Sequence, residues 1–454
     1  MSRAPHAPGR LRRSRWAGAP WALLVLVALP TGAGAQPALG SLERATLARP
    51  ETPVIVPGVR LDRLLGAPRD ELRVYAWRDG ALTPIPFQVD ERTPEERYAF
   101  DKGDERRSDT DDGRLDINDE LVFMARDVGD RVAPEAVDLG QRALEEVLVT
   151  DPRGGGQGWV YVLRFPTAPP PPSPRRYVRL EWRDGELAGW SGDRAQVLGP
   201  QIDENVFYFQ QLRFAGADGA YGADVLDRAK ISLEASYLFL DLRRKADEIR
   251  AEILGYTEGP VRIVASFQLE TYLIWGHWVR STHRCRMKIY GNRLEIEAEL
   301  TLPVDLEPSR KSALRFSLDH APGVGDVTVW TPKGEAVVAN GRGGKEARRL
   351  ERALPPWVML SSGEGSVLAR LRLSNDLQRP TNALFLEDGR ASDPPEDHPG
   401  SHGNAGFALD LTELAAGTYD LTLVLQFGPP LAPGQEQRLL RVDDAPLQTI
   451  VTRE

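Results

Sequence analysis

The stretch Gly291–Leu300, GNRLEIEAEL, places the strongest constraint on the fold. After a Gly-Asn turn, Leu294, Ile296, Ala298 and Leu300 alternate with polar and charged residues. Successive side chains of a β-strand point to opposite faces, so this alternation predicts a strand with one apolar face and one charged face. A helix of the same sequence would scatter its apolar residues around its surface. The chain must therefore build a sheet that is buried on one side at this point.

The same pattern recurs along the chain, in residues 71–77, 231–256 and 260–279. No segment shows a convincing helix of three turns, although residues 141–148, QRALEEVL, are compatible with a short one. Long antiparallel strands with one apolar face are typical of β-sandwiches. The sequence thus predicts an all-β protein of multidomain antiparallel β-sandwiches, in which a large central sandwich is flanked by smaller β domains.

A proline-rich stretch separates two of the expected domains. Residues 165–176, FPTAPPPPSPRR, contain four consecutive prolines, which favour an extended polyproline II spacer. A chain of 454 residues also exceeds what one hydrophobic core normally supports. The expected organisation is a signal peptide at 1–35, an N-terminal β domain at 41–165 that includes an acidic loop, a linker at 166–176, a central β-sandwich at 177–349, and a C-terminal β unit at 350–454 that packs with the central sandwich or stands beside it.

The first 35 residues are typical of an export signal. A basic segment with Arg10, Arg12, Arg13 and Arg15 precedes the apolar run 21–29, WALLVLVAL, and small residues follow at the expected cleavage site. The apolar run is shorter than the roughly 20 residues that span a bilayer. We expect an exported protein, periplasmic or extracellular, without a transmembrane helix in its mature chain.

Charge and cysteine content restrict the partners. Without residues 1–35 the chain has 52 basic and 66 acidic residues, a net charge of −14. Nucleic acids require a basic surface, so we expect no nucleic-acid partner. Cys285 is the single cysteine, which excludes an intramolecular disulfide, and its alternating context predicts a buried thiol.

An acidic loop, residues 108–119, is the first candidate site. Calcium prefers six to eight oxygen ligands, and an acidic loop with a glycine at its bend can supply them. The candidate ligands carry side-chain oxygens and flank Gly113: Asp109, Asp111, Asp112, Asp116, Asn118 and Asp119. The register differs from that of a helical-hand calcium loop, because Ser108 falls at the first position. The alternative is a solvated turn in which Asp and Asn side chains bond their own backbone.

A segment rich in aromatic, histidine and arginine side chains is the second candidate site. Aromatic rings combined with such hydrogen-bond donors suit a sugar or a uronate. The candidate ligand-binding residues are Tyr272, Trp275, His277, Trp278, Arg280, His283 and Arg284. Both faces of a strand at 272–278 would be rather apolar, so the alternative is a strand buried on two sides. No catalytic residue is assigned by motif.

Two resemblances add to this interpretation. Residues 74–91, 111–131 and 392–427 together resemble a family of exported bacterial β-rich proteins of uncharacterised activity. That resemblance implies export and architecture, and no activity. Residues 253–274, a strand, Glu-Gly-Pro-Val-Arg, strand pattern, weakly resemble the galactose-mutarotase-like supersandwich domains of carbohydrate-active proteins.

Function remains open between two classes. The first is an exported cell-envelope or secreted binding or structural protein, stabilised by calcium if the acidic loop binds it, with a polysaccharide or an envelope protein as partner. The second is a carbohydrate-binding protein or a carbohydrate-active enzyme, a polysaccharide lyase or glycoside hydrolase, that uses the central sandwich. The sequence favours a non-enzymatic role.

Overall fold

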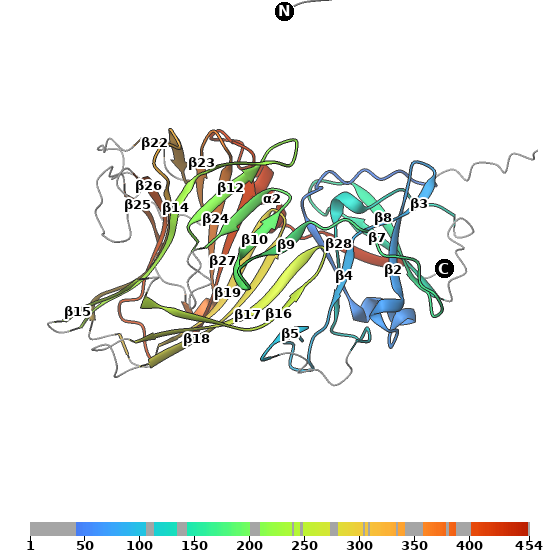
Figure 1. The fold of residues 1–454 in the computed structure, drawn as a ribbon, viewed down its shortest axis with the longest axis horizontal. Coiled ribbons are helices and arrows are strands. Elements are labelled where there is room, and N and C mark those ends of the chain that lie inside the picture. The colour runs from blue at the N-terminus through green and yellow to red at the C-terminus, as the bar shows by residue number, and fades with distance from the viewer. Residues whose placement is uncertain are drawn as a thin grey trace, which may run out of the picture. The chain divides into compact units, whose positions relative to one another are not determined.

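All the strands that the computed structural model describes lie within Leu39–Glu454. The residues it describes are 42–105, 113–133, 143–199, 209–237, 240–245, 248–272, 280–302, 305–306, 309–332, 335–340, 357–377, 381–386 and 401–452. The expected signal peptide, 1–35, lies outside them. The architecture is all-β with several antiparallel sheets, which confirms the predicted fold class (Figure 1).

Two small sheets enclose the core of the N-terminal part. The first has three strands, in the order β1 (Pro53–Pro57), β6 (Glu120–Met124) and β4 (Phe87–Asp90). The second has five strands, in the order β28 (Gln448–Thr452), β7 (Ala143–Thr150), β8 (Gln157–Arg164), β2 (Leu72–Arg78) and β3 (Ala81–Pro84). Apolar side chains from both sheets form a single buried cluster. Short 3-10 helices connect the strands: η1 (Gly58–Arg60), η2 (Asp62–Leu64), η3 (Arg69–Glu71) and η4 (Ala125–Asp127).

Strand β28 brings the end of the chain back to its beginning. It pairs with β7 along its whole length, from Gln448 opposite Thr150 to Thr452 opposite Glu146, and Figure 1 shows it in red among the blue and cyan strands. Strand β7 covers most of residues 141–148, so the short helix with which that stretch was compatible does not form. The reason is that Val147, Val149 and the fully buried Glu145 face one core with a period of two.

A sheet of ten strands forms the larger wall of the central sandwich. Its order is β22 (Val337–Ala339), β21 (Val327–Trp330), β23 (Trp357–Ser361), β24 (Ser366–Leu373), β27 (Gly417–Gly428), β19 (Arg293–Leu302), β18 (Arg280–Tyr290), β17 (Arg262–Tyr272), β16 (Arg250–Glu258) and β5 (Lys102–Gly103). The C-terminal strands β23, β24 and β27 lie side by side between two groups of central strands, and β5 adds a strand from the N-terminal part at the edge of the sheet.

Two five-stranded sheets face the inner side of this wall. One has the order β15 (Leu240–Lys245), β14 (Leu226–Tyr237), β20 (Ser309–His320), β26 (His402–Asp410) and β25 (Thr381–Leu386). The other has the order β13 (Tyr221–Asp224), β12 (Gln211–Ala215), β11 (Ala195–Leu198), β10 (Glu186–Gly192) and β9 (Val178–Arg183). The largest hydrophobic cluster among the described residues lies between these sheets.

Helical structure is scarce in the described residues. The α-helix α2 spans Gln437–Asp444, and a further 3-10 helix, η7, spans Asn375–Leu377. Leu439 and Leu440 of α2 pack against Trp330 and Trp357 at the end of the ten-stranded sheet. Within the described ranges, no helix has the length and hydropathy needed to cross a bilayer.

Candidate functional site

The outer face of the ten-stranded sheet carries charge because of the alternation seen in the sequence. In β19, Leu294 and Ile296 point into the sandwich core, while Glu295, Glu297 and Glu299 occupy the other face. The neighbouring strand β18 presents basic side chains on this outer face: Arg284, Arg286 and Lys288. On the other side, β27 aligns Asp420 with Glu299 and Thr422 with Glu297. A sheet surface of opposite charges in adjacent strands results.

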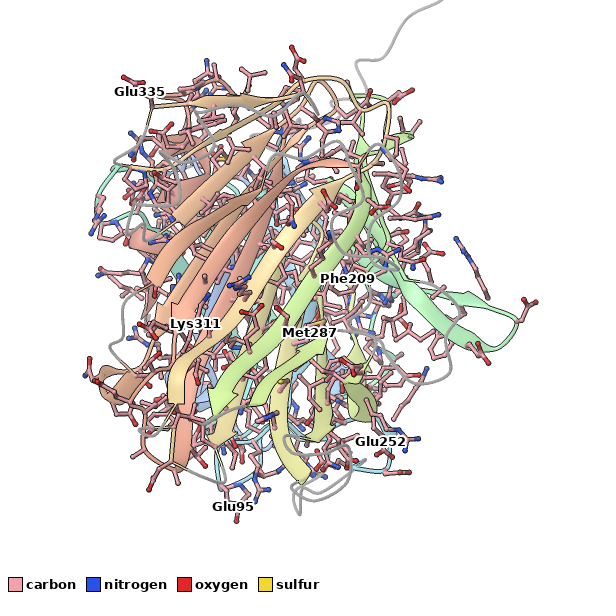
Figure 2. The ribbon with its side chains drawn as sticks, turned by 90° about the vertical axis from the view of Figure 1, so that its left-hand side faces the viewer. Glu95, Phe209, Glu252, Met287, Lys311 and Glu335 are labelled. Carbon is pink, nitrogen blue, oxygen red and sulfur yellow. The ribbon has the colours of Figure 1, made fainter. Side chains whose placement is uncertain are left out.

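A cleft of about 550 Å³ lies over this surface. One wall consists of side chains of β17, β18, β19 and β27, and the other of residues 93–105 from the N-terminal part. Five carboxylates and three guanidinium groups line it, together with two aromatic rings and smaller polar residues. These charged and aromatic residues are Glu95, Glu105, Glu297, Glu299, Asp420, Arg97, Arg284, Arg286, Tyr98 and Phe100. Figure 2 labels Glu95, near the lower end of the view.

Some of the charges in the cleft are paired. Arg286 Nη1 lies 3.1 Å from Glu297 Oε2, and Lys288 Nζ lies 2.6 Å from Glu297 Oε1. Arg284 forms an ion pair with Glu105 across the cleft. Glu299 and Asp420 are exposed and lie directly opposite each other in adjacent strands. Within the described residues neither of these two has an ion-pair partner, so this end of the cleft concentrates negative charge.

Beneath the cleft, Arg262 anchors residues 91–101 to the sheet. Arg262 is fully buried, and its Nε lies 2.7 Å from Asp90 Oδ2. Its other nitrogens form an ion pair with Glu120 and donate hydrogen bonds to the hydroxyls of Tyr290, at 3.0 Å, and Tyr98, at 3.4 Å. Burial alone would raise the pKa of Glu120, but Arg262 lowers it to about 2. For Asp90 burial prevails and the pKa is raised, although Arg262 opposes the shift.

Tyr98 joins residues 91–101 to the charged outer face of the ten-stranded sheet. Its ring is buried, and the cationic groups of Arg92, Arg262, Arg286 and Lys288 lie 4.9, 5.6, 5.6 and 5.9 Å from the ring centroid. Cations near an aromatic face are attracted by its quadrupole. Burial raises the pKa of Tyr98 to about 12, so the phenol stays protonated and donates to Glu120 at 2.9 Å. The wall of the cleft is therefore held firmly.

The described residues of the second predicted site, the candidate sugar-binding segment 272–284, do not form one site in the structure. Trp275, His277 and Trp278 lie outside the described residues. Tyr272 and Arg280 are paired at the ends of β17 and β18, and only their backbone is described. His283 faces the inside of the sandwich, whereas Arg284 lines the cleft on the outside.

His283 is part of the packed interior of the sandwich. It is buried, and its Nδ1 accepts a hydrogen bond of 3.0 Å from the backbone N–H of Thr301. Burial lowers the pKa of His283 to about 4, against a weaker opposing hydrogen bond with the backbone of Glu299. The imidazole is thus neutral near pH 7. Its neighbour on the inner face, Cys285, is also buried, and burial raises the pKa of this thiol to about 12.

The acidic loop is described from Gly113 onward. Asp109, Asp111 and Asp112 lie outside the described residues. Asp116 Oδ1 accepts the N–H groups of Asn118 and Asp119, at 3.0 and 3.2 Å, and Asp119 Oδ2 accepts the N–H of Asp116 at 2.8 Å. These are the backbone hydrogen bonds expected of an Asp/Asn turn.

The same turn is tied to its surroundings. Asp119 Oδ1 accepts the N–H of Arg92 at 2.9 Å, and Asn118 Nδ2 donates to the carbonyl of Thr93 at 2.8 Å. Burial raises the pKa of Asp119 to about 7, against these backbone hydrogen bonds. Among the described residues, no group of three or more His, Cys, Asp or Glu side chains is arranged to hold a metal ion. The turn supports the start of β6 and the segment that covers the cleft.

Most residues of the cleft were not singled out from the sequence. The alternating acids of residues 293–299 were visible as the charged face of a strand, but such a face is usually only solvated. Asp420 lies over 100 positions away in the chain, and Glu95, Arg97 and Glu105 belong to a different part of it. Only the pairing of β19 with β27 and the docking of residues 93–105 bring these side chains together.

The comparisons with known proteins give only a distant structural similarity. No family model and no curated protein matches the sequence. A solved structure of a protein in the glycosyl hydrolase family 38 from Enterococcus faecalis is similar with a TM-score of 0.43 and 11% identity, over 90% of this chain and 47% of that one. An α-mannosidase from Enterococcus faecalis V583 is similar with a TM-score of 0.43 and 10% identity, over 90% of this chain and 45% of that one.

This chain thus spans about half the length of those two structures. A similarity this distant says nothing about substrate or activity. Neither of the two is a galactose mutarotase, so the resemblance expected for residues 253–274 stays a prediction.

Proposed function

We propose that this chain is an exported cell-envelope or secreted binding protein, and that the charged cleft holds a hydroxyl-rich ligand such as a segment of polysaccharide. The volume of about 550 Å³ is within the usual range of about 300–1,000 Å³ for ligand sites. Most such sites have predominantly apolar linings. The lining here is dominated by carboxylates and guanidinium groups, which suits a ligand that must exchange many hydrogen bonds with water for hydrogen bonds with protein.

The observation that carries this proposal is the like-charge pair Glu299 and Asp420 at one end of the cleft. Like charges directly opposite each other in adjacent strands destabilise a sheet, so folding alone does not favour the pair. Carboxylates accept hydrogen bonds only, and sugar hydroxyls are donors that can satisfy them. Arg284 of strand β18 lies opposite Glu299 in the sheet. Its guanidinium can donate hydrogen bonds to acceptor oxygens of the same ligand.

A panel of polysaccharides and their oligosaccharides, scored by binding, tests the proposal. Asp420→Asn and Arg284→Met should each weaken binding of the ligand that the panel identifies, by about tenfold for each lost charged hydrogen bond. The matched control is Glu364→Gln, which neutralises an exposed acid in the loop between β23 and β24, away from the cleft residues. If no glycan binds, or if the variants and the control bind alike, the proposal is wrong.

The rival function is a carbohydrate-active enzyme, a glycoside hydrolase or a polysaccharide lyase. One observation favours it: Glu297, Glu299 and Asp420 project from two adjacent strands into one cleft. Glycoside hydrolases use two carboxylates that flank the scissile bond. The same panel is therefore also scored for new reducing ends or unsaturated products. Cleavage that is lost in Glu297→Gln or Glu299→Gln would assign the enzymatic role, and binding without cleavage would assign the binding role.

Calcium binding by the acidic loop and export by the first 35 residues are separate proposals. Three of the six predicted calcium ligands, Asp116, Asn118 and Asp119, lie within one turn, and the pKa of Asp119 is raised by burial, which a bound cation would reverse. Ligand binding to the folded state must raise its melting temperature. If neither calcium nor a chelator changes the melting temperature, the calcium site is excluded.

The export proposal has its own test. N-terminal sequencing of protein recovered outside the cytoplasm shows whether the chain is cleaved after residue 35.

A further inference from the structure

The inner side of the same sheet borders a second cavity, of about 130 Å³, between the two walls of the central sandwich. Strands β14, β20 and β26 line it from one side, and β17, β18, β19, β24 and β27 line it from the other. Figure 2 shows these facing sheets, with Met287 of β18 and Lys311 of β20 labelled. The described lining residues are leucine, isoleucine, phenylalanine, alanine and cysteine, apart from His283 and Arg315.

Neither polar residue requires a polar occupant. His283 is neutral near pH 7, since burial lowers its pKa to about 4, and its Nδ1 already accepts the N–H of Thr301. Arg315 forms an ion pair of 3.0 Å with Glu234. It stands between Leu314 and Phe316, which face the cavity, so strand alternation directs its guanidinium to the outside. The cavity therefore offers an occupant little except apolar surface.

This cavity is open, in contrast to an ordinary packing defect. Several side chains that point between the sheets remain only half-buried: Ile249, Leu269, Ala298, Leu314, Phe316 and Leu371. Elsewhere in the sandwich the inward-pointing residues Ile263, Leu294 and Ala339 are completely buried. Accessible apolar side chains at one end of a well-packed core indicate a site that an apolar group enters from outside.

We propose that this cavity binds a single alkyl chain, such as that of a fatty acid. Apolar cavities of about 150 Å³ lined by Leu, Ile and Phe stay dry and take up small apolar molecules. Sheets that pack face to face lie about 10 Å apart, and side chains fill this space outside the cavity, so the about 130 Å³ that remain suit a slender chain. Arg315, the one cation among the described lining residues, is paired with Glu234 and directed away from the cavity, so a carboxylate head group stays at the accessible end. The inference is independent of the proposed glycan site, because it rests on the opposite face of the sheet.

Calorimetric titration of the folded protein with octanoate, decanoate and dodecanoate, and with butyrate as the short control, tests the inference. Burying each added CH₂ contributes about 0.8 kcal/mol, so affinity should increase about fourfold for each methylene until the cavity is full. Bound dodecanoate should also raise the melting temperature, as any ligand of the native state does. Butyrate should not bind measurably. The absence of binding by dodecanoate, or equal affinity for all four acids, would overturn the proposal.

Filling the cavity provides the structural test. Ala298→Leu places three additional carbons in the cavity from the half-buried Ala298 of β19, and should weaken dodecanoate binding at least tenfold. The matched control is Ala223→Leu, the same change at an exposed position of strand β13, which should bind as the native chain does. If Ala298→Leu does not fold, Leu371→Phe fills the cavity from β24. A folded cavity-filling variant that binds dodecanoate as tightly as the control would refute the site.

Discussion

Arg262 and Asp90 form a completely buried ion pair, in which Arg262 Nε lies 2.7 Å from Asp90 Oδ2 and joins strand β17 of the ten-stranded sheet to strand β4 of the N-terminal part. Glu120 of β6 and the hydroxyls of Tyr98 and Tyr290 complete the set of partners. All of the guanidinium's contacts with acids come from the N-terminal sheets. Arg262 thus helps to position the cleft wall formed by residues 93–105, together with the pairing of β5 with β16.

The first prediction concerns removal of this cation. Arg262→Met leaves Asp90 buried without a positive partner and leaves Glu120 with Arg92 alone. Breaking a buried pair in this way typically costs about 3–5 kcal/mol. We expect a decrease of this size in the free energy of unfolding, measured by urea denaturation. Arg262→Lys should recover only part of it, because an ammonium cannot reproduce the fork of a guanidinium.

The matched control for Arg262 is Arg179→Met. Arg179 is an exposed residue of β9 whose ion pair with Glu181 is 3.4 Å long. Exposed pairs contribute about 0–1 kcal/mol, so this change should be close to neutral. Equal effects of Arg262→Met and Arg179→Met would show that the buried network does not hold the two parts together.

The second prediction concerns the close approach of backbone at Gly259. A Cβ at this position would lie 2.0 Å from Gln88 Oε1, the atom that accepts the N–H groups of Val261, at 3.0 Å, and Arg262, at 2.9 Å. Gly259→Ala must displace Gln88 and leave these two donors without their acceptor. Loss of partners for buried polar groups costs about 1–3 kcal/mol, which we expect in urea denaturation.

Gly363→Ala is the matched control for Gly259. A Cβ at Gly363 would meet nothing within 4 Å. Gly363→Ala should therefore not destabilise the protein, and should raise its free energy of unfolding by about 0.4–1 kcal/mol, because alanine restricts the unfolded chain. A stable Gly259→Ala protein with an unchanged unfolding midpoint would contradict the role assigned to Gln88.

The alternation of Leu294, Ile296 and Leu300 with acids was sufficient to predict the strand and its two faces. The all-β architecture follows from repetition of that local pattern. Residues 141–148 were ambiguous because the apolar positions of LEEVL fit either period over such a short run. Pairing of β7 with β8 and β28 resolves the ambiguity, and it depends on residues at the far end of the chain.

The cleft could not be predicted in the same way. Its composition depends on which strands become neighbours, and the pairing of Glu299 with Asp420 crosses more than a hundred residues. The adjacent residues His283 and Arg284 were expected to share one site, but strand geometry places them on opposite faces of the sheet. Neighbouring residues of a strand point to opposite faces, so a site predicted from a continuous sequence segment groups side chains that are not in contact.

The third prediction concerns pH. Burial lowers the pKa of His283 to about 4, below the ordinary value of 6.5 that the unfolded chain retains. The stability that the neutral imidazole contributes is therefore fully present above pH 6.5 and is lost as the pH falls through 4. The loss approaches about 1.4 kcal/mol per pH unit between these values. We expect His283→Gln to show a flatter dependence of unfolding free energy on pH between 6.5 and 4.

Two measurements check this expectation for His283. The difference in unfolding free energy between the native chain and His283→Gln, taken at several pH values, isolates this residue from other titrating groups. An NMR titration should show its imidazole signals unchanged down to about pH 5. Parallel pH profiles for the two proteins, or an imidazole that titrates near 6.5, would contradict the buried, neutral state.

The last prediction separates stability from binding at the cleft. Asp420→Asn removes the repulsion between Asp420 and Glu299, a cross-strand effect of about 0.2–1 kcal/mol. The variant should therefore be slightly more stable in urea than the native chain, while its affinity for the cleft ligand falls. Opposite changes in stability and binding are expected where a residue is retained for function. Glu364→Gln, an exposed acid away from the cleft, should change neither quantity. A less stable Asp420→Asn protein would instead show that Asp420 serves the fold, and the argument that this pair marks a ligand site would fail.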